Sequence, residues 1–184
     1  MNNFECLTPE VTWFARTIPP HVIKYRVKDD KLLSSLMKSV DDEGDKMGHS
    51  TNLMCDMTSY RSQTFSPHKS TYEKTIDLIS DIFRVNDLEL KVIDIWVGKY
   101  VSQDYARRHN HGDALWSFWI YLNEGKDFPP LQLENFGEVE PEKGLLIFFP
   151  SWVFHEVKSK KFGGARYVCA GNIKSIWGSF KCIE

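Results

Sequence analysis

The sequence has little net charge and no long apolar run. Its 23 Lys and Arg residues nearly balance its 25 Asp and Glu residues, which leaves a formal net charge of -2. So small a charge gives no general attraction to nucleic acid or to an anionic membrane. No segment approaches the roughly 20 apolar residues of a membrane span, and Glu5 and Pro9 interrupt the amino-terminal segment where a signal peptide would have its apolar core. We therefore expect a cytoplasmic protein that binds neither nucleic acid nor membrane.

Paired cysteines and internal repeats are also missing. The four cysteines, Cys6, Cys55, Cys169 and Cys182, are scattered and form no CxxC pair. This pattern indicates neither a disulfide framework nor a structural zinc site, so we expect reduced thiols. No repeat, low-complexity tract or Pro/Ser-rich linker divides the 184 residues. A chain of this length without a linker predicts a single domain, residues 1–184.

Two amphipathic helices are predicted in the first half of the chain. The apolar residues at helical spacing are Leu33, Leu36, Met37 and Val40, and then Tyr72, Ile76, Ile79 and Phe83. Ser70 and Glu73 have the spacing of a capping box at the start of the second helix. The polar stretch Asp41–Ser50 reads as a loop between the helices. Residues 20–86 are thus predicted to be a helical support.

From residue 88 onward the pattern changes to short strands. The segments LELKVIDIWVG, LWSFWIYLN, LQLENF, GLLIFFPSW, HEVKS and ARYVCAGNI are rich in aromatic and β-branched residues and are separated by Gly, Pro, Asp and Asn. Strands without intervening helices do not build a parallel, doubly wound sheet. The sequence therefore predicts a mainly β fold with flanking helices, whose core over residues 88–177 is an antiparallel jelly roll, or double-stranded β-helix, of the cupin type.

Candidate metal ligands gather in the stretch RRHNHGDALW, residues 107–116. His111 and Asp113 form an H-x-D pair, and residues two apart in an extended chain point the same way. His155 follows an apolar strand and a Pro-Ser turn, where its side chain can also face inward. Two histidines and one carboxylate make the facial triad of non-haem Fe(II), which leaves positions open for other ligands. His109 stands equally near His111, so His109, His111 and His155 form an alternative set.

Arg166 lies eleven residues beyond His155, at the start of an apolar strand. An arginine that points inward there needs a carboxylate or phosphate partner, because an isolated buried charge is very costly. A dicarboxylate keto acid would fill the open positions on the iron and also pair with the arginine. One end would chelate the iron, and the other would be held by the guanidinium at two points.

At this point the residues resemble a known family. His111, Asp113, the WIYLN strand, the LLIFFPSWVFHEV segment with His155, and Arg166 resemble the 2-oxoglutarate/Fe(II)-dependent oxygenases, in particular the prolyl-4-hydroxylase-like branch, over about residues 96–173. The segments NLMCDMTSY, RHNHGDALWSFWIYL, FFPSWVFHEV and RYVCAGNI are similar to small oxygenase-like proteins found often in bacteriophages, and this extends the likeness over most of the chain. A phage protein would work in the host cytoplasm.

The resemblance implies a set of cofactors and site residues. His111, Asp113 and His155 would hold Fe(II), Arg166 would hold 2-oxoglutarate, and O2 would take the remaining position. Such enzymes commonly carry a hydroxyl residue two positions after the arginine, where this chain has Val168. Tyr121 or an asparagine such as Asn172 would then supply the second contact to the cosubstrate, although Asn172 is equally suited to closing a turn. The small phage-type relatives also tend to carry H-x-H, which matches His109 and His111.

The predicted function is hydroxylation of a C–H bond, with release of succinate and CO2. The resemblance implies a peptidyl proline, or else a small molecule, as substrate, bound at a mouth bordered by residues 98–108 and 41–59. One alternative is a cupin-type metalloenzyme that uses His109, His111 and His155 without 2-oxoglutarate, which would leave Arg166 without a task. The other is a non-catalytic jelly-roll binding or structural module, which would not respond to iron.

Overall fold

The structure is a computed structural model that describes residues 3–8, 21–45 and 51–176. Three helices, α1 (Asp30–Glu43), α2 (Ser62–Phe65) and α3 (Lys69–Val85), lie in the first half. The strands are β1 (Phe4–Cys6), β2 (Ile23–Val27), β3 (Leu53–Met54), β4 (Asp56–Met57), β5 (Leu90–Tyr100), β6 (Tyr105–His109), β7 (Trp116–Tyr121), β8 (Leu131–Leu133), β9 (Gly137–Val139), β10 (Leu145–Pro150), β11 (His155–Val157) and β12 (Arg166–Ser175).

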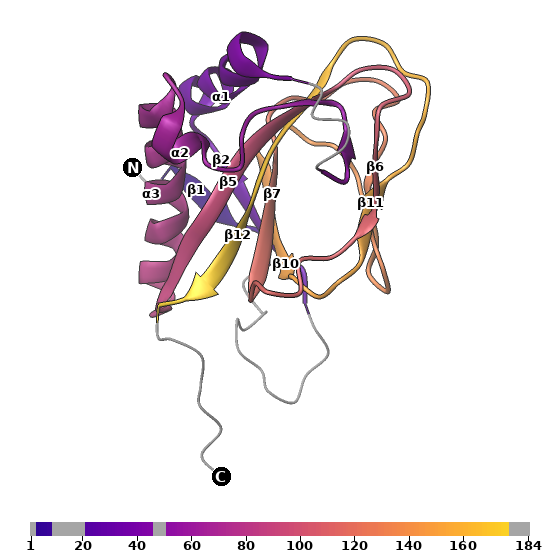
Figure 1. The fold of residues 1–184 in the computed structure, drawn as a ribbon. Helices are drawn as coiled ribbons and strands as arrows, with labels where there is room; N and C mark the ends of the chain where they lie inside the picture. Colours follow the sequence, from indigo (N-terminus) through magenta and orange to yellow (C-terminus); the bar gives the residue numbers. More distant parts are fainter. Residues whose placement is uncertain (1–2, 9–20, 46–50, 177–184) are drawn as a thin grey trace.

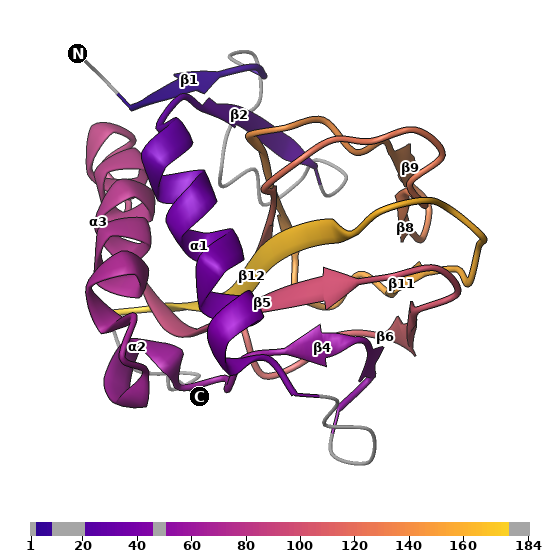
Figure 2. The same ribbon diagram turned by 90° about the horizontal axis from the view of Figure 1, so that it is seen from above.

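The strands form two facing sheets. The large sheet has the order β1-β2-β10-β7-β12-β5-β4, and the small sheet has the order β3-β6-β11-β8-β9. All pairings between these strands are antiparallel. Figures 1 and 2 show α1 and α3 on the outer face of the large sheet, with the small sheet opposite its inner face. The predicted mainly β, antiparallel fold with flanking helices is confirmed.

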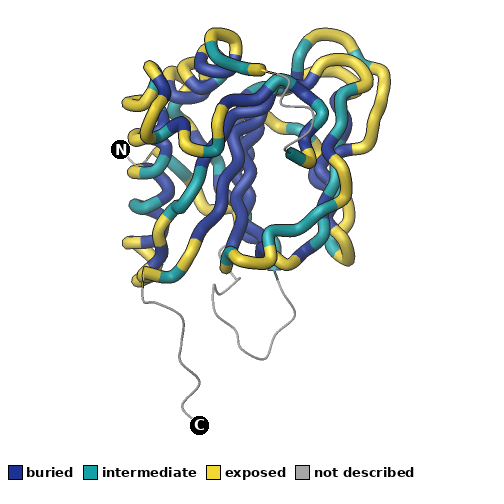
Figure 3. The backbone as a smooth tube through the Cα atoms, in the orientation of Figure 1, coloured by how far each residue is buried: buried dark blue, intermediate teal, exposed yellow. Residues whose placement is uncertain are grey.

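The central strands of the large sheet are covered on both faces. Every residue of β7 and of β10 is buried, and Figure 3 shows this buried band in the middle of the molecule. On β7, Phe118 and Ile120 pack toward the helices, whereas Trp119 and Tyr121 face the small sheet. Burial on both faces explains why these strands are continuously apolar and do not alternate with polar residues.

Helices α1 and α3 occur where the apolar spacing predicts them, but their ends differ from the prediction. The Asp29 side chain accepts a hydrogen bond from the Leu32 amide and so caps α1. Helix α1 runs through Glu43, so Asp41 is helical, and residues 46–50 of the predicted loop lie outside the described residues. Helix α3 begins at Lys69 without a side-chain cap, so the predicted capping box is wrong: Ser70 already lies inside the first turn.

The segment predicted to be a helical support also contains strands. The side chains of Ile23, Tyr25 and Val27 alternate inward along β2, which pairs with β10 in the large sheet. This alternation is a strand signal in the sequence itself. Strands β3 and β4 lie in the same segment and add one strand to each sheet.

Two further observations concern membrane spans and thiols. No helix among the described residues is long and apolar enough to cross a membrane. Cys6, Cys55 and Cys169 are free thiols, and Cys182 lies outside the described residues.

Candidate metal and anion site

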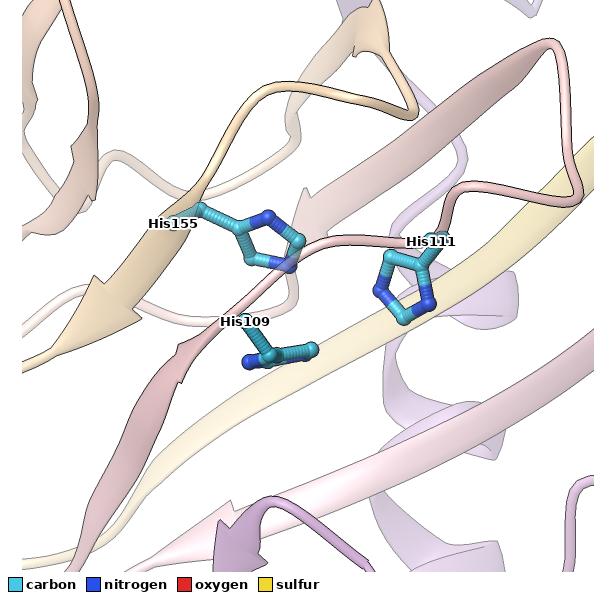
Figure 4. Close-up of side chains that lie close together, drawn as sticks. All are labelled: His109, His111 and His155. Carbon is cyan, nitrogen blue, oxygen red and sulfur yellow. The ribbon is translucent and has the colours of Figure 1, made fainter.

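Three histidines converge in the space between the two sheets. His109 ends β6, His155 begins β11, and the two residues are direct partners across these antiparallel strands. His111 lies two residues beyond β6, where its backbone N–H donates to the Ser151 carbonyl at 2.7 Å. One ligand nitrogen from each ring lies within 4.8 Å of the others, and Figure 4 shows the three rings gathered together. The three rings are thus close enough to bind one metal ion together.

The imidazoles are arranged as neutral ligands. The Nδ1 of His155 lies 3.0 Å from the Val153 carbonyl, and that of His109 lies 2.6 Å from the Arg107 carbonyl. A carbonyl can only accept, so Nδ1 carries the hydrogen in both rings and Nε2 keeps its lone pair. A second ring hydrogen bond of this kind orients metal-binding histidines.

Burial keeps these rings uncharged. It lowers the pKa of His155 to about 3 and that of His111 to about 4, and it also lowers the pKa of His109. Repulsion from the neighbouring imidazoles adds to the effect for His155 and His111. Because all three are neutral near pH 7, their lone pairs are available to a cation without displacing protons.

Asp113 is not brought to this cluster. Its side chain is exposed, and its carboxylate is not among the ligand groups that lie within 4.8 Å of one another. The expectation that Asp113 shares a face with His111 assumes an extended chain. The chain instead turns after His111, whose carbonyl accepts a hydrogen bond from the Ala114 amide at 2.9 Å. The two-residue alternation holds for His109 and His111, so His109, and not Asp113, lies with His111 and His155 in the cluster.

Arg166 lies at the other end of the same interior. Its side chain is fully buried (0 % exposed), and none of its three guanidinium nitrogens makes a hydrogen bond of ordinary geometry to a residue that the structure describes. The guanidinium carbon lies 4.9 Å from the centre of the Tyr100 ring and 5.3 Å from those of Trp119 and Tyr121. Aromatic faces attract a cation but cannot accept five N–H hydrogen bonds. A buried guanidinium in this state could hold an anion such as a carboxylate or a phosphate.

The two residues predicted as further cosubstrate contacts both make hydrogen bonds within the fold, and Tyr121 also interacts with Arg166. The Tyr121 hydroxyl donates to the Val139 carbonyl at 2.6 Å and accepts from the Leu131 amide at 3.1 Å. Asn172 lies opposite Asp94 and not beside Arg166, whose partner across the strands is Tyr100. The structure therefore brings Arg166 together with the Tyr121 ring, and it does not bring Asn172 to them.

Tyr100 is a candidate contact that the sequence analysis does not single out. Its hydroxyl is fully buried beside the Cys55 thiol, yet it makes no hydrogen bond of ordinary geometry. Burial raises its pKa well above the ordinary value, so the hydroxyl keeps its proton and can donate it to an anion next to Arg166. The signal was the two-residue alternation of Trp96, Gly98 and Tyr100, which places all three on the inner face of β5.

The pairing of β12 with β5 and β7 decides which residues are neighbours on the inner face of the large sheet. Next to the Tyr100–Arg166 pair, Val168 lies between Gly98 and Tyr121, and in the following row Ala170 lies between Trp96 and Trp119. A cavity reaches these indoles and the histidines; it is lined by Leu53, Trp96, Ala106, His109, His111, Ser117, Phe118, Trp119, Leu131, Phe149, His155, Ala170 and Gly171.

A row of hydrogen-bonded polar side chains lies next to Ala170 on the inner face, on the side away from Arg166. The Asp94 carboxylate accepts from both the backbone and the side-chain N–H of Asn172, at 2.8 and 3.3 Å. Asn172 Oδ1 in turn accepts from Ser117 Oγ at 2.8 Å, and Ser117 Oγ lies 3.0 Å from Ser151 Oγ. The Ser151 carbonyl holds His111, so this row supports one wall of the histidine cluster. Asp94, for which the sequence analysis finds no role, has a place here.

Comparison with known proteins gives likeness at the level of the fold. No protein-family model matches the sequence, and no curated protein matches it. A solved prolyl-4-hydroxylase from Pseudomonas putida is 20 % identical, with a TM-score of 0.60 over 96 % of this chain and 94 % of that one. The viral collagen prolyl hydroxylase of Paramecium Bursaria Chlorella virus-1 is 15 % identical, with a TM-score of 0.60 over 80 % and 92 %.

A third solved structure extends the likeness to a different activity. The non-heme alpha-ketoglutarate-dependent epimerase SnoN from nogalamycin biosynthesis is 9 % identical and has a TM-score of 0.66 over 85 % of this chain and 78 % of that one. With the two facing antiparallel sheets, these similarities confirm the predicted double-stranded β-helix. They also show that the resemblance read from the sequence corresponds to a shared fold.

Proposed function

We propose that the protein is an Fe(II)- and 2-oxoglutarate-dependent oxygenase that hydroxylates a C–H bond. The observation that carries the proposal is the joint presence of three convergent neutral histidines and a fully buried arginine that makes no hydrogen bond of ordinary geometry among the described residues, on facing walls of one interior. Three histidines alone suit several metals, and a buried arginine alone suits any carboxylate or phosphate. Together they suit a ligand with a metal-chelating end and a carboxylate end, which is the chemistry of a keto dicarboxylate.

In this proposal His109, His111 and His155 hold the iron, in place of the set with Asp113. The carbonyl partners of His109 and His155 fix the two rings, and the backbone bond to Ser151 holds His111. When bound, the iron and 2-oxoglutarate supply the activation of O2, with succinate and CO2 as by-products. The aromatic walls around the cavity exclude water from this chemistry.

Arg166 and Tyr100 orient the cosubstrate. The guanidinium offers a two-point contact to the distal carboxylate, and the Tyr100 hydroxyl supplies the second donor that Val168 cannot. Trp119 and Tyr121 form the apolar floor beneath the guanidinium.

The substrate is proposed to be a peptidyl residue, with proline as the first candidate, or a small molecule. Two of the similar structures are prolyl hydroxylases, and a third is an epimerase, so the fold itself leaves the substrate open. The loop that follows β5 and the segment that includes β3 and β4 are the proposed borders of the substrate mouth.

A second candidate follows from the ligand set itself. Three imidazoles without a carboxylate also suit a metal-dependent dioxygenase whose own substrate bears the carboxylate and chelates the metal, with no 2-oxoglutarate. In that case Arg166 would hold the carboxylate of the substrate.

Succinate formation and O2 consumption separate these functions. The purified protein is supplied with 2-oxoglutarate, with and without Fe(II), and His155→Ala serves as the metal-site control. Iron-dependent succinate that the variant does not produce supports the oxygenase. Iron-dependent O2 consumption that requires another carboxylate, without succinate, supports the second candidate. Protein that neither binds iron nor consumes O2 is a non-catalytic binding module, which would refute both.

A further inference from the structure

Asp94 is a half-buried carboxylate that lies on the inner face of the large sheet. Its neighbours Ile95 and Trp96 pack on opposite faces of β5, and the two-residue alternation places Asp94 on the inner face with Trp96. Its partner across the strands, Asn172, contacts Ser117, which lines the cavity beside the histidines. The proposed function gives Asp94 no task, although a charged group in such a position calls for a partner.

The hydrogen bonds of Asp94 use only part of its capacity as an acceptor. Its two oxygens accept from the backbone and the side-chain N–H of Asn172, at 2.8 and 3.3 Å. An ionised carboxylate offers about four acceptor positions, so roughly two remain. Burial raises the pKa of this carboxyl, and the Asn172 hydrogen bonds and the charge of Lys174 offset the effect only in part. The ionised form is therefore stabilised by a further cation.

No cation of the described chain takes the remaining positions. Lys174 acts on Asp94 electrostatically, but its side chain is exposed and the two residues form no ion pair. Arg61 is likewise exposed and forms no ion pair with Asp94. The exposed Asp113 lies in the loop after His111 and adds a second negative charge to the surface beside the histidines. These charges favour a positively charged ligand.

Asp94 lies near the histidine cluster and is open to solvent. It is two residues from Trp96 along β5, a separation of about 7 Å. The Trp96 ring centre in turn lies 6.1 Å from that of His111. Asp94 and His111 are both half-buried, so each can be reached from solvent. A ligand with a positive group at one end and an aliphatic chain can therefore bridge Asp94 and the histidines, and its positive group needs no space in the small cavity between the sheets.

We propose that the prime substrate carries an alkylammonium or guanidinium group and that Asp94 binds this group and so selects the substrate. The inference rests on the proposed oxygenase function and names the chemistry of its substrate. Tyr60 and Trp96, whose ring centres lie 4.9 Å apart, supply aromatic surface for the aliphatic part. The cation belongs either to a basic side chain of a peptide or to a free amine, since the recognition chemistry is the same.

The test measures iron-dependent formation of succinate from 2-oxoglutarate by the full chain, with probes that differ in charge but little in shape. A tripeptide with a central lysine is compared with the same tripeptide acetylated on the lysine Nζ, and free L-lysine is compared with L-norleucine. We expect the charged member of a pair to stimulate succinate formation with a KM about tenfold below that of its neutral partner. Stimulation by the tripeptide assigns the cation to a peptide, and stimulation by free lysine assigns it to a small molecule.

Two variants and a matched control test the residue. Asp94→Asn keeps an oxygen acceptor for the Asn172 amide but removes the charge, and is expected to raise the KM of the charged probe about tenfold without changing kcat or the KM of the neutral probe. Asp94→Glu keeps the charge and is expected to retain the preference. Asp113→Asn makes the same change at an exposed carboxylate outside the histidine cluster and is expected to change nothing. A purely structural role of Asp94 would instead affect both probes alike.

The failures can be told apart. If no iron-dependent succinate forms with any probe or without one, the proposed oxygenase is wrong and this inference falls with it. If succinate forms but the charged probes act no better than their neutral partners, or if Asp94→Asn keeps the preference, only the cationic substrate is refuted. Should Asp94→Asn fail to fold, the comparison of the probe pairs in the native protein still decides.

Discussion

Replacing Arg166 by methionine should make the ligand-free protein more stable while removing its ability to bind the cosubstrate. Methionine keeps an unbranched, flexible side chain of similar length and removes the charge. In the native protein the guanidinium is fully buried and makes no hydrogen bond of ordinary geometry. The ligand-free fold therefore carries a desolvated cation that, among the described residues, is offset mainly by the Tyr121 hydroxyl and the ring faces of Tyr100, Trp119 and Tyr121.

The expected gain in stability follows from this imbalance. Replacing buried ionic groups by apolar ones of similar volume is often neutral or stabilising by about 1–4 kcal/mol. The lost contacts with the aromatic faces reduce the gain, so we expect about 2 kcal/mol. For a chain of this size that raises the melting temperature by about 4–8 °C. The gain and the loss of binding have one cause, because the unpaired cation destabilises the empty site and attracts the anion.

Urea unfolding with and without 2-oxoglutarate, in the presence of Mn(II), measures both effects. At a ligand concentration one hundred times the Kd, the native protein should gain about 2.7 kcal/mol, whereas Arg166→Met should gain nothing. Arg108→Met is the matched control, since Arg108 is exposed, pairs with Glu134 at 2.6 Å and packs over Phe154. A surface pair of this kind is worth at most about 1 kcal/mol.

Two results would refute the reasoning. If Arg166→Met lost more than about 1 kcal/mol without ligand, the guanidinium would be a structural group that the aromatic faces satisfy. If the variant still gained stability from 2-oxoglutarate, the cosubstrate would bind elsewhere.

Three further predictions address the remaining site residues. His109→Ala should abolish stoichiometric iron binding, measured by iron analysis, whereas Asp113→Ala should keep it. Asp113→Ala should also change the free energy of unfolding in urea by no more than about 0.5 kcal/mol. Loss of iron from Asp113→Ala but not from His109→Ala would restore the triad with Asp113. Tyr100→Phe should weaken 2-oxoglutarate about tenfold by calorimetry, since a hydrogen bond to a charged group is lost, and an unchanged Kd would exclude Tyr100. The pKa values of His111 and His155 are lowered on folding, so the unfolded chain takes up protons first as the pH falls. The stability of the metal-free protein is therefore highest above about pH 6.5 and falls as the pH drops toward about 4 for His111 and about 3 for His155, with a loss on the order of 3 kcal/mol for His111. A free energy of unfolding that does not change with pH over this range would contradict the prediction.

The sequence alone determines the kind of fold and several residues of the site. Short aromatic strands after residue 88 predict antiparallel sheets, because no helical segments lie between them to serve as parallel crossovers. Arg166 stands out because a charge at the start of such a strand must face a partner or solvent. The alternation in β2 was also readable, since Ile23, Tyr25 and Val27 show it directly.

Only the tertiary structure decides which residues meet. His109 and Asp113 are equally spaced from His111, and the choice depends on where strand pairing ends: His109 is still paired with His155, whereas the Ala114 amide closes a turn that carries Asp113 to the surface. The aromatic surroundings of Arg166, the place of the Tyr100 hydroxyl beside Cys55 and the hydrogen bonds of the Tyr121 hydroxyl are likewise properties of packed neighbours from distant strands. Periodicity fixes the face on which a side chain lies, but hydrogen-bond partners and burial are set by contacts far apart in the chain, which local spacing does not encode.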